Sequence, residues 1–213
     1  MPSYLHMRTL LFSALCLCAF VGVTVLADSP KSASVGQPAP DFTLTGSDNK
    51  PHSLADYKGK FVVLEWTNPQ CPFVQRFYGT KAMQSLQKTE TAKGVAWVRI
   101  NSSAEGKEGY QSVTDIAAYN KAHHVAATAT LIDPTGQVGH LYGARTTPQM
   151  FVINPKGVLI YAGGIDDNAT ADPSDVPAST NYVTKALDEA KAGQPVKTST
   201  SSPYGCSVKY ASN

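Results

Sequence analysis

The chain has 213 residues, of which 42% are hydrophobic and 16% are charged, and its formal net charge is +2 at pH 7. This is the composition of a globular protein with enough apolar material for a core, and the length fits one domain with appendages. The small net charge and the scattered basic residues exclude the kind of basic surface that binds nucleic acid or anionic membranes.

The N-terminal segment has the pattern of a signal peptide. Arg8 precedes an apolar run that ends at Ala27, where polar residues follow. A basic start, a short apolar centre and a small-residue exit are typical of a leader that is cleaved on export. We expect residues 1–27 to be removed together with Cys16 and Cys18, leaving a periplasmic or secreted protein without an integral membrane span. The alternative is that the apolar run stays as a membrane anchor.

After a linker at residues 28–34, the pattern predicts one domain over residues 35–192 and a Ser/Thr-rich tail over residues 193–213. Apolar runs bounded by turn residues predict strands, and apolar residues at helical spacing predict helices. The expected strands are at 42–44, 52–54, 61–66, 94–100, 130–133, 149–153 and 158–161, and the expected helices are at 72–88, 112–123 and 181–192.

This order of elements predicts the fold class. Strands and helices alternate first, and an antiparallel hairpin around residues 154–157 follows. The pattern therefore predicts an α/β fold, with a mixed central sheet between helices, a leading β-hairpin and a C-terminal tail. The acidic residues at 166–167 and 172–175 predict a solvated loop before the last helix.

Five features occur in an order that resembles one protein superfamily. They are Ala39–Phe42 at the domain start, Lys58–Lys60 before the first central strand, Trp66 at its end, Cys71–Pro72 at the helix start, and Thr147–Pro148 before the hairpin. Across the predicted domain, this set resembles the thioredoxin superfamily, in particular its exported, peroxiredoxin-related redoxins. The resemblance implies a thioredoxin-like fold in which a cis proline, here Pro148, faces the active cysteine.

The chain departs from the superfamily at the cysteine motif. Thioredoxins carry two cysteines in Cys-x-x-Cys spacing, and Asn68 stands where the first would be. Peroxiredoxins place a threonine three residues before their cysteine, whereas Thr67 is four residues before Cys71. They also have an arginine at the position of Pro148, and Arg145 is out of register with it. The resemblance therefore implies weak peroxidase or antioxidant activity at most.

Cys71 and Cys206 are the candidate catalytic pair. Cys71 precedes Pro72 where a strand leads into a helix, and backbone N–H groups at a helix N-terminus favour a thiolate there. We expect Cys71 at an accessible helix start, with Trp66, Asn68, Pro72, Thr147 and Pro148 as neighbours. Cys206 lies in a tail long enough to cross the domain. An oxidising compartment then favours a Cys71–Cys206 disulfide.

These residues predict a thiol–disulfide redox protein that acts on protein thiols, protein disulfides or small oxidants, without a cofactor or a metal. One alternative is a non-catalytic binding domain in which a Cys71–Cys206 disulfide only holds the tail. Another is copper binding, for which His123, His124 and His140 are the candidate histidines. Glu65, inside an apolar strand, is either a buried proton shuttle or a carboxylate that reaches solvent.

Overall fold

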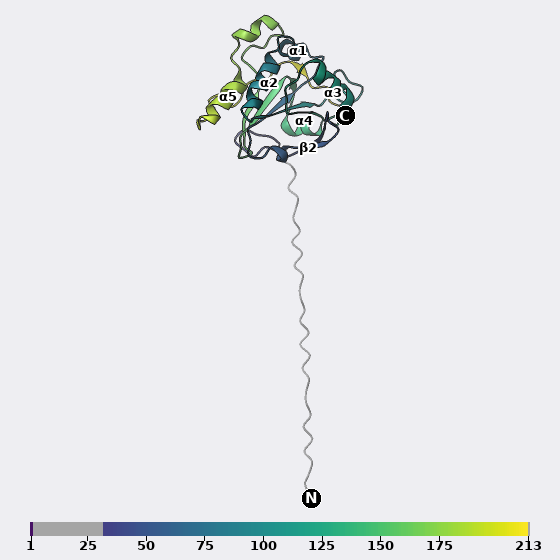
Figure 1. The fold of residues 1–213 in the computed structure, drawn as a ribbon, viewed down its shortest axis with the longest axis vertical. Helices are drawn as coiled ribbons and strands as arrows, with labels where there is room; N and C mark the ends of the chain where they lie inside the picture. The colour runs from purple at the N-terminus through teal and green to yellow at the C-terminus, as the bar shows by residue number, and fades with distance from the viewer. Residues whose placement is uncertain (2–31, 213) are drawn as a thin grey trace.

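The computed structural model describes Met1 and residues 32–212, so the predicted leader at 1–27 lies outside the described residues. The strands of the main sheet are β1 (Thr43–Gly46), β2 (Pro51–Ser53), β3 (Val62–Trp66), β4 (Ala96–Asn101), β5 (Ala129–Ile132), β7 (Gln149–Ile153) and β8 (Leu159–Gly163). The helices are α1 (Pro72–Gly79), α2 (Ala82–Ala92), α3 (Val113–Ala122), α4 (Gln137–Tyr142) and α5 (Tyr182–Lys191), with short 3-10 helices at Leu54–Tyr57 and Pro173–Ala178 (Figure 1).

Within the described residues, the main sheet has seven strands in the order β2-β1-β5-β4-β3-β7-β8. β3, β4 and β5 are parallel, and the other neighbouring pairs are antiparallel. The parallel strands are joined through helices, which cover the faces of the sheet as parallel strands require. The predicted mixed sheet between helices, with a hairpin at each end, is confirmed.

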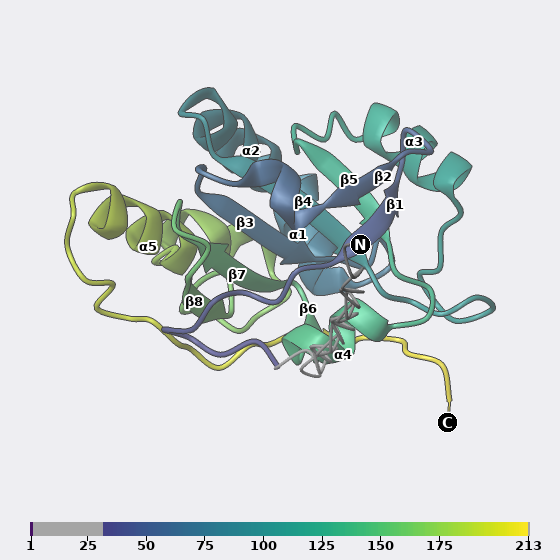
Figure 2. The same cartoon turned by 90° about the horizontal axis from the view of Figure 1, so that it is seen from below.

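Two apolar clusters pack on the two faces of this sheet. Helices α1, α2 and α5 contribute to the cluster that contains Val63 and Cys71. Helix α4 contributes to the other cluster, which contains Leu64 and Trp66, and it lies across the sheet from α2 (Figure 2). Successive side chains of β3 therefore alternate between the two clusters, as they do in any buried strand. In the part of the chain that the structure describes, no helix has the length and apolarity needed to span a bilayer.

The helix predicted at residues 72–88 is two helices, α1 and α2. The chain turns between them at Lys81, whose φ of 63° is left-handed and cannot continue a right-handed helix. The Thr80 hydroxyl donates to the Arg76 carbonyl at 2.9 Å and so satisfies a carbonyl at the end of α1. The prediction of one continuous helix was wrong because the residues around this turn include no proline to signal the break.

The predicted tail is packed onto the domain. It runs from the end of α5 past β8 and α4 to the C-terminus (Figure 2, yellow). Thr200 forms a β-bridge with Ala162, and Val208 is buried in the Trp66 cluster. At the other end of the described chain, Ala33 donates its backbone N–H to the Leu141 carbonyl at 2.9 Å. Both flanks of the central domain therefore contribute to its packing.

Candidate active site

Cys71 is the N-cap residue of α1, and Pro72 occupies the first helical position. The Cys71 carbonyl accepts hydrogen bonds from the backbone N–H groups of Val74 and Gln75, each at 2.9 Å. This arrangement matches the predicted Cys-Pro helix start. The Cys71 side chain, however, has an exposed fraction of 0%. The expectation of an accessible cysteine was therefore wrong, because residues distant in sequence cover the helix start.

Thr147, the residue before Pro148, lies against Cys71. The Thr147–Pro148 peptide bond is cis. The Cys71 thiol donates a hydrogen bond to the Thr147 carbonyl oxygen at 3.0 Å, so the sulfur and this backbone edge are in direct contact. Thr147 belongs to a short strand, β6 (Thr146–Thr147), and both Thr147 and Pro148 are buried.

The C-terminal tail brings Cys206 to the same place. Strand β9 (Cys206–Ser207) pairs antiparallel with β6, so that Cys206 lies opposite Thr147. Both cysteines are free thiols in this structure, and Cys206 is partly exposed. Burial raises the pKa of the Cys206 thiol to about 12, and the neighbouring Cys71 thiol adds to this rise. The structure therefore brings together the two cysteines that the sequence singled out, although they are roughly 135 residues apart.

Anchors on both sides of Cys206 hold β9 in position. Before it, the Tyr204 hydroxyl donates to the Asp166 carboxylate, and the Tyr204 ring packs edge-on against Phe73 of α1 with centroids 5.9 Å apart. After it, the Val208 N–H donates to the Arg145 carbonyl at 3.0 Å. The residues that flank the cysteine are therefore tied to α1, to the loop of Asp166 and to the loop after α4.

Gly205 lets the tail approach β6 closely. Its φ is 124°, a conformation that residues with a side chain rarely adopt, and a Cβ at this position would lie 2.0 Å from the Thr147 carbonyl oxygen. Only glycine fits between Tyr204 and Cys206 in this docked position. The Gly-Cys pair is a sequence signal that, read together with a partner strand, would have identified the contact.

The sequence analysis also placed Asp166 wrongly. It was expected in a solvated loop, but its exposed fraction is 3% and its carboxylate pairs with the Arg76 guanidinium at 2.8 Å. Arg76 also donates to the carbonyls of Asn168 and Thr170 at 2.7 and 2.5 Å. The acidic loop therefore folds back onto α1, because a buried arginine there requires a counter-charge.

Asn68 and Trp66 are both buried, and Asn68 contacts Cys71 through the backbone, where the Cys71 N–H donates to the Asn68 carbonyl at 3.1 Å. Asn68 donates to the Glu108 carbonyl at 3.4 Å and accepts from the Gln70 N–H at 2.8 Å, which holds the turn before α1. Trp66 lies in the cluster on the other face of the sheet, where its indole donates to the Ser102 hydroxyl at 3.0 Å. Asn68 therefore shapes the strand-to-helix turn that leads into Cys71, whereas the Trp66 side chain packs away from it.

Glu65 is the centre of a buried polar network. Its side chain has an exposed fraction of 0%, so the interpretation that it reaches solvent was wrong. The carboxylate accepts hydrogen bonds from Tyr78 at 2.8 Å, Gln87 at 3.0 Å and Trp97 at 2.7 Å, and it pairs with the Arg99 guanidinium at 3.5 Å. Burial is the main cause that raises the pKa of Tyr78 well above its usual value. These four partners occupy the carboxylate oxygens, and none of them is a cysteine.

The histidines considered for copper lie apart from the cysteine pair. His123 stacks on Tyr119 at 3.9 Å between ring centroids, and His140 stacks on Tyr210 at 4.0 Å. Over residues 32–212, no group of three or more His, Cys, Asp or Glu side chains is placed to hold a metal ion.

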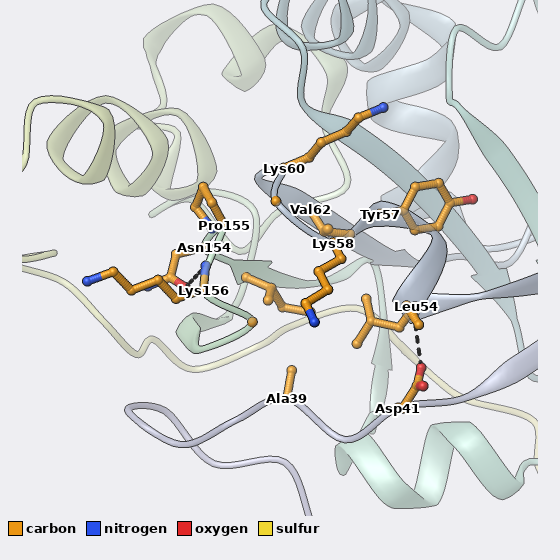
Figure 3. Close-up of a pocket in the computed structure, with 14 residues that line it drawn as sticks. Ala39, Asp41, Leu54, Tyr57, Lys58, Lys60, Val62, Asn154, Pro155 and Lys156 are labelled. Carbon is orange, nitrogen blue, oxygen red and sulfur yellow. Dashed lines mark hydrogen bonds between the residues drawn. The ribbon is translucent and has the colours of Figure 1, made fainter.

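A cavity of about 190 Å³ lies at the opposite end of β3 from Cys71, next to Val62. Leu54, Tyr57 and Pro155 line it, and the Lys58 side chain extends across it (Figure 3). It contains neither cysteine, so the chemistry of the pair is separate from this cavity.

Comparison with known proteins agrees with the geometry. The chain is 32% identical over 157 residues to the thiol-disulfide oxidoreductase ResA of Geobacillus kaustophilus, an alignment that covers 72% of this chain and 83% of that protein. A hypothetical protein of Sinorhizobium meliloti superposes with a TM-score of 0.72 at 24% identity, covering 86% of this chain and 98% of that one. A putative thioredoxin of Neisseria meningitidis superposes with a TM-score of 0.52 at 18% identity, covering 72% and 92%.

These structural likenesses confirm the predicted thioredoxin-like fold. The model of the AhpC/TSA family matches residues 35–162, which include β3, Cys71 and the Thr147–Pro148 bond. The match covers more than half of the chain and confirms the resemblance that the five sequence features implied. The protein belongs to the AhpC/TSA family.

Proposed function

We propose that this protein is a thiol–disulfide oxidoreductase in which Cys71 and Cys206 form and break one disulfide. The observation that carries the proposal is the pairing of β9 with β6, which holds Cys206 against Cys71 at the start of α1. Oxidation of the pair removes two protons and two electrons and joins the sulfurs. A partner disulfide accepts them in this direction, and a partner dithiol supplies them when the bond is reduced again. The oxidoreductase name of the ResA relative agrees with this chemistry.

The first test is the state and the potential of the pair. Protein purified without reductant should contain the Cys71–Cys206 disulfide, which peptide mapping under non-reducing conditions detects. Its reduction potential should fall in the range of thiol oxidoreductases, about −120 to −270 mV. Two free thiols after exposure to an oxidising glutathione buffer would contradict the proposal. The Cys206→Ser variant is the matched control, because it keeps the tail and loses the bond.

A second candidate function is a non-catalytic domain in which the same disulfide only fastens the tail. The anchors at Tyr204 and Val208 favour it, because a tail already held on both sides of Cys206 suits a permanent bond. A potential below about −300 mV, without turnover of a dithiol substrate, would select this function over the redox cycle.

Peroxidase activity should be weak. The Thr67 hydroxyl accepts a hydrogen bond from the Arg99 guanidinium at 3.3 Å, and the Arg76 guanidinium pairs with Asp166. Both groups are therefore engaged by partners other than the Cys71 sulfur. Loss of such polarising donors typically slows a reaction by about two to three orders of magnitude. Stopped-flow measurement should therefore show slow consumption of hydrogen peroxide, and a rate typical of dedicated peroxidases would contradict this expectation.

We also propose that the protein is exported, with the leader removed near Ala27. The support is the basic start, apolar run and small-residue exit of residues 1–27, together with a cysteine pair suited to an oxidising compartment. N-terminal sequencing of protein recovered from the native host should give a start near Asp28. A chain that still begins at Met1 would indicate the retained anchor instead.

A further inference from the structure

The two sulfurs of the candidate site differ in how they can be reached. Cys71 has an exposed fraction of 0% and lies under the Thr147 carbonyl and strand β9, whereas Cys206 is partly exposed. A thiolate that opens a disulfide attacks one sulfur and expels the other, so access decides which sulfur is attacked.

We propose, building on the disulfide of the proposed function, that Cys206 is the sulfur at which this protein exchanges with a partner dithiol, and that Cys71 is the buried leaving sulfur. The partner thiolate forms a bond to the Cys206 sulfur while the Cys71–Cys206 bond breaks and its electron pair goes to Cys71. The second thiolate of the partner then attacks the partner's own sulfur and releases Cys206. The partner leaves as a disulfide, and the protein gains two electrons and two protons.

The docked tail maintains this difference in access. Tyr204 is bonded to Asp166 and packed on Phe73, so the residues before Cys206 cannot swing away without breaking both contacts. The pairing of Cys206 with Thr147 keeps β9 over the helix start. The contacts of Tyr204 and the pairing of β9 with β6 do not depend on the disulfide. In this structure both cysteines are thiols, and the tail is nevertheless docked.

The surroundings of Cys206 favour its protonated form once it has been released. Burial and the adjacent Cys71 raise its pKa to about 12, Glu108 acts in the same direction, and Lys209 opposes it. A released Cys206 therefore takes up a proton at neutral pH and does not return as a nucleophile on the partner's new disulfide.

The test maps which sulfur carries the probe. Full-length oxidised protein is mixed with reduced glutathione, quenched in acid and analysed by peptide mapping. We expect glutathione on Cys206 at roughly ten times its level on Cys71 or more. Glutathione predominantly on Cys71 would overturn the proposal, whereas absence of any disulfide in the starting protein would contradict the proposed function instead.

Single-cysteine variants test access even if no disulfide forms. The rate of modification by glutathione disulfide at pH 9, divided by the thiolate fraction measured for each variant, should be at least about tenfold higher for Cys206 in Cys71→Ser than for Cys71 in Cys206→Ser. Adding Gly205→Ala to Cys206→Ser forces β9 away from the Thr147 carbonyl, and Cys71 should then react about tenfold faster or more. Circular dichroism confirms that each variant is folded. Equal rates in the two single-cysteine variants would show that the tail does not control access to the sulfurs. The same would follow if adding Gly205→Ala to Cys206→Ser, in a protein that stays folded, did not accelerate the reaction of Cys71.

Discussion

Glu65→Gln will lower the free energy of unfolding by about 3–5 kcal/mol, the usual cost of removing one partner from a buried ion pair. The Arg99 guanidinium, which is 2% exposed, loses its counter-charge. The new amide N–H₂ also replaces one of the two acceptor oxygens, of which one receives the Tyr78 hydrogen bond and the other receives those of Gln87 and Trp97. For a domain of this size, a loss of 3–5 kcal/mol corresponds to a melting temperature lower by about 6–20 °C.

Thermal and urea unfolding of Glu65→Gln measure this change, with Glu105→Gln as the matched control. Glu105 is exposed, so its substitution should change the stability by less than about 0.5 kcal/mol. The same variant tests the proton-shuttle interpretation of Glu65. The side chains that bond to the Glu65 carboxylate do not include a cysteine. The pH dependence of dithiol oxidation by Glu65→Gln should therefore follow that of the wild type, at a temperature where both proteins are folded. A shifted pH profile would instead indicate that Glu65 exchanges protons with the cysteine pair.

Asp166→Asn will have the second large effect, again about 3–5 kcal/mol, because it leaves the Arg76 guanidinium buried without a counter-charge. The Arg76 side chain has an exposed fraction of 0%, so water cannot replace the lost partner without a rearrangement. The carboxylate also accepts the Tyr204 hydroxyl, so the substitution weakens the anchor that precedes Cys206. A loosened tail lowers the effective concentration of Cys206 at Cys71, and the reduction potential should become less negative.

Two readouts separate these effects of Asp166→Asn. The melting temperature reports the buried pair, and equilibration with glutathione reports the potential. Tyr204→Phe removes only the hydroxyl, so it should shift the potential in the same direction with a smaller loss of stability. Asp188→Asn, at an exposed position of α5, is the control for both. If Asp166→Asn behaves like Asp188→Asn, the Arg76–Asp166 pair does not stabilise the fold.

The central sheet could be predicted from sequence because its strands are locally determined. Each strand of the parallel core is an apolar run that ends at a turn, and no distant residue is needed to recognise it. The Cys71–Pro72 helix start is local in the same way. The break at Lys81 was missed because a left-handed lysine has no reliable sequence signature, unlike a glycine or a proline.

The burial of Cys71 and the role of Asp166 depend on contacts between segments far apart in the chain. Strand β9 has two residues, which is too short for a periodic pattern, and its register is set by Thr147 rather than by its own sequence. Asp166 resembles any acidic loop residue until Arg76 is placed beside it. The sequence could therefore identify both cysteines but not which of them faces solvent.

The position of Cys206 near the C-terminus also constrains how the oxidised protein is made. Synthesis delivers Cys71 first, and about 135 residues must follow before its partner emerges. Because residues 32–212 contain only these two cysteines, one intramolecular pairing exists there, and no isomerase is needed to choose among alternatives. The hazard is different: until the tail arrives, an exposed Cys71 on a nascent chain can attack the disulfide of another molecule and remain bound to it as a mixed disulfide. Completion of the last strand therefore both closes the site and protects it.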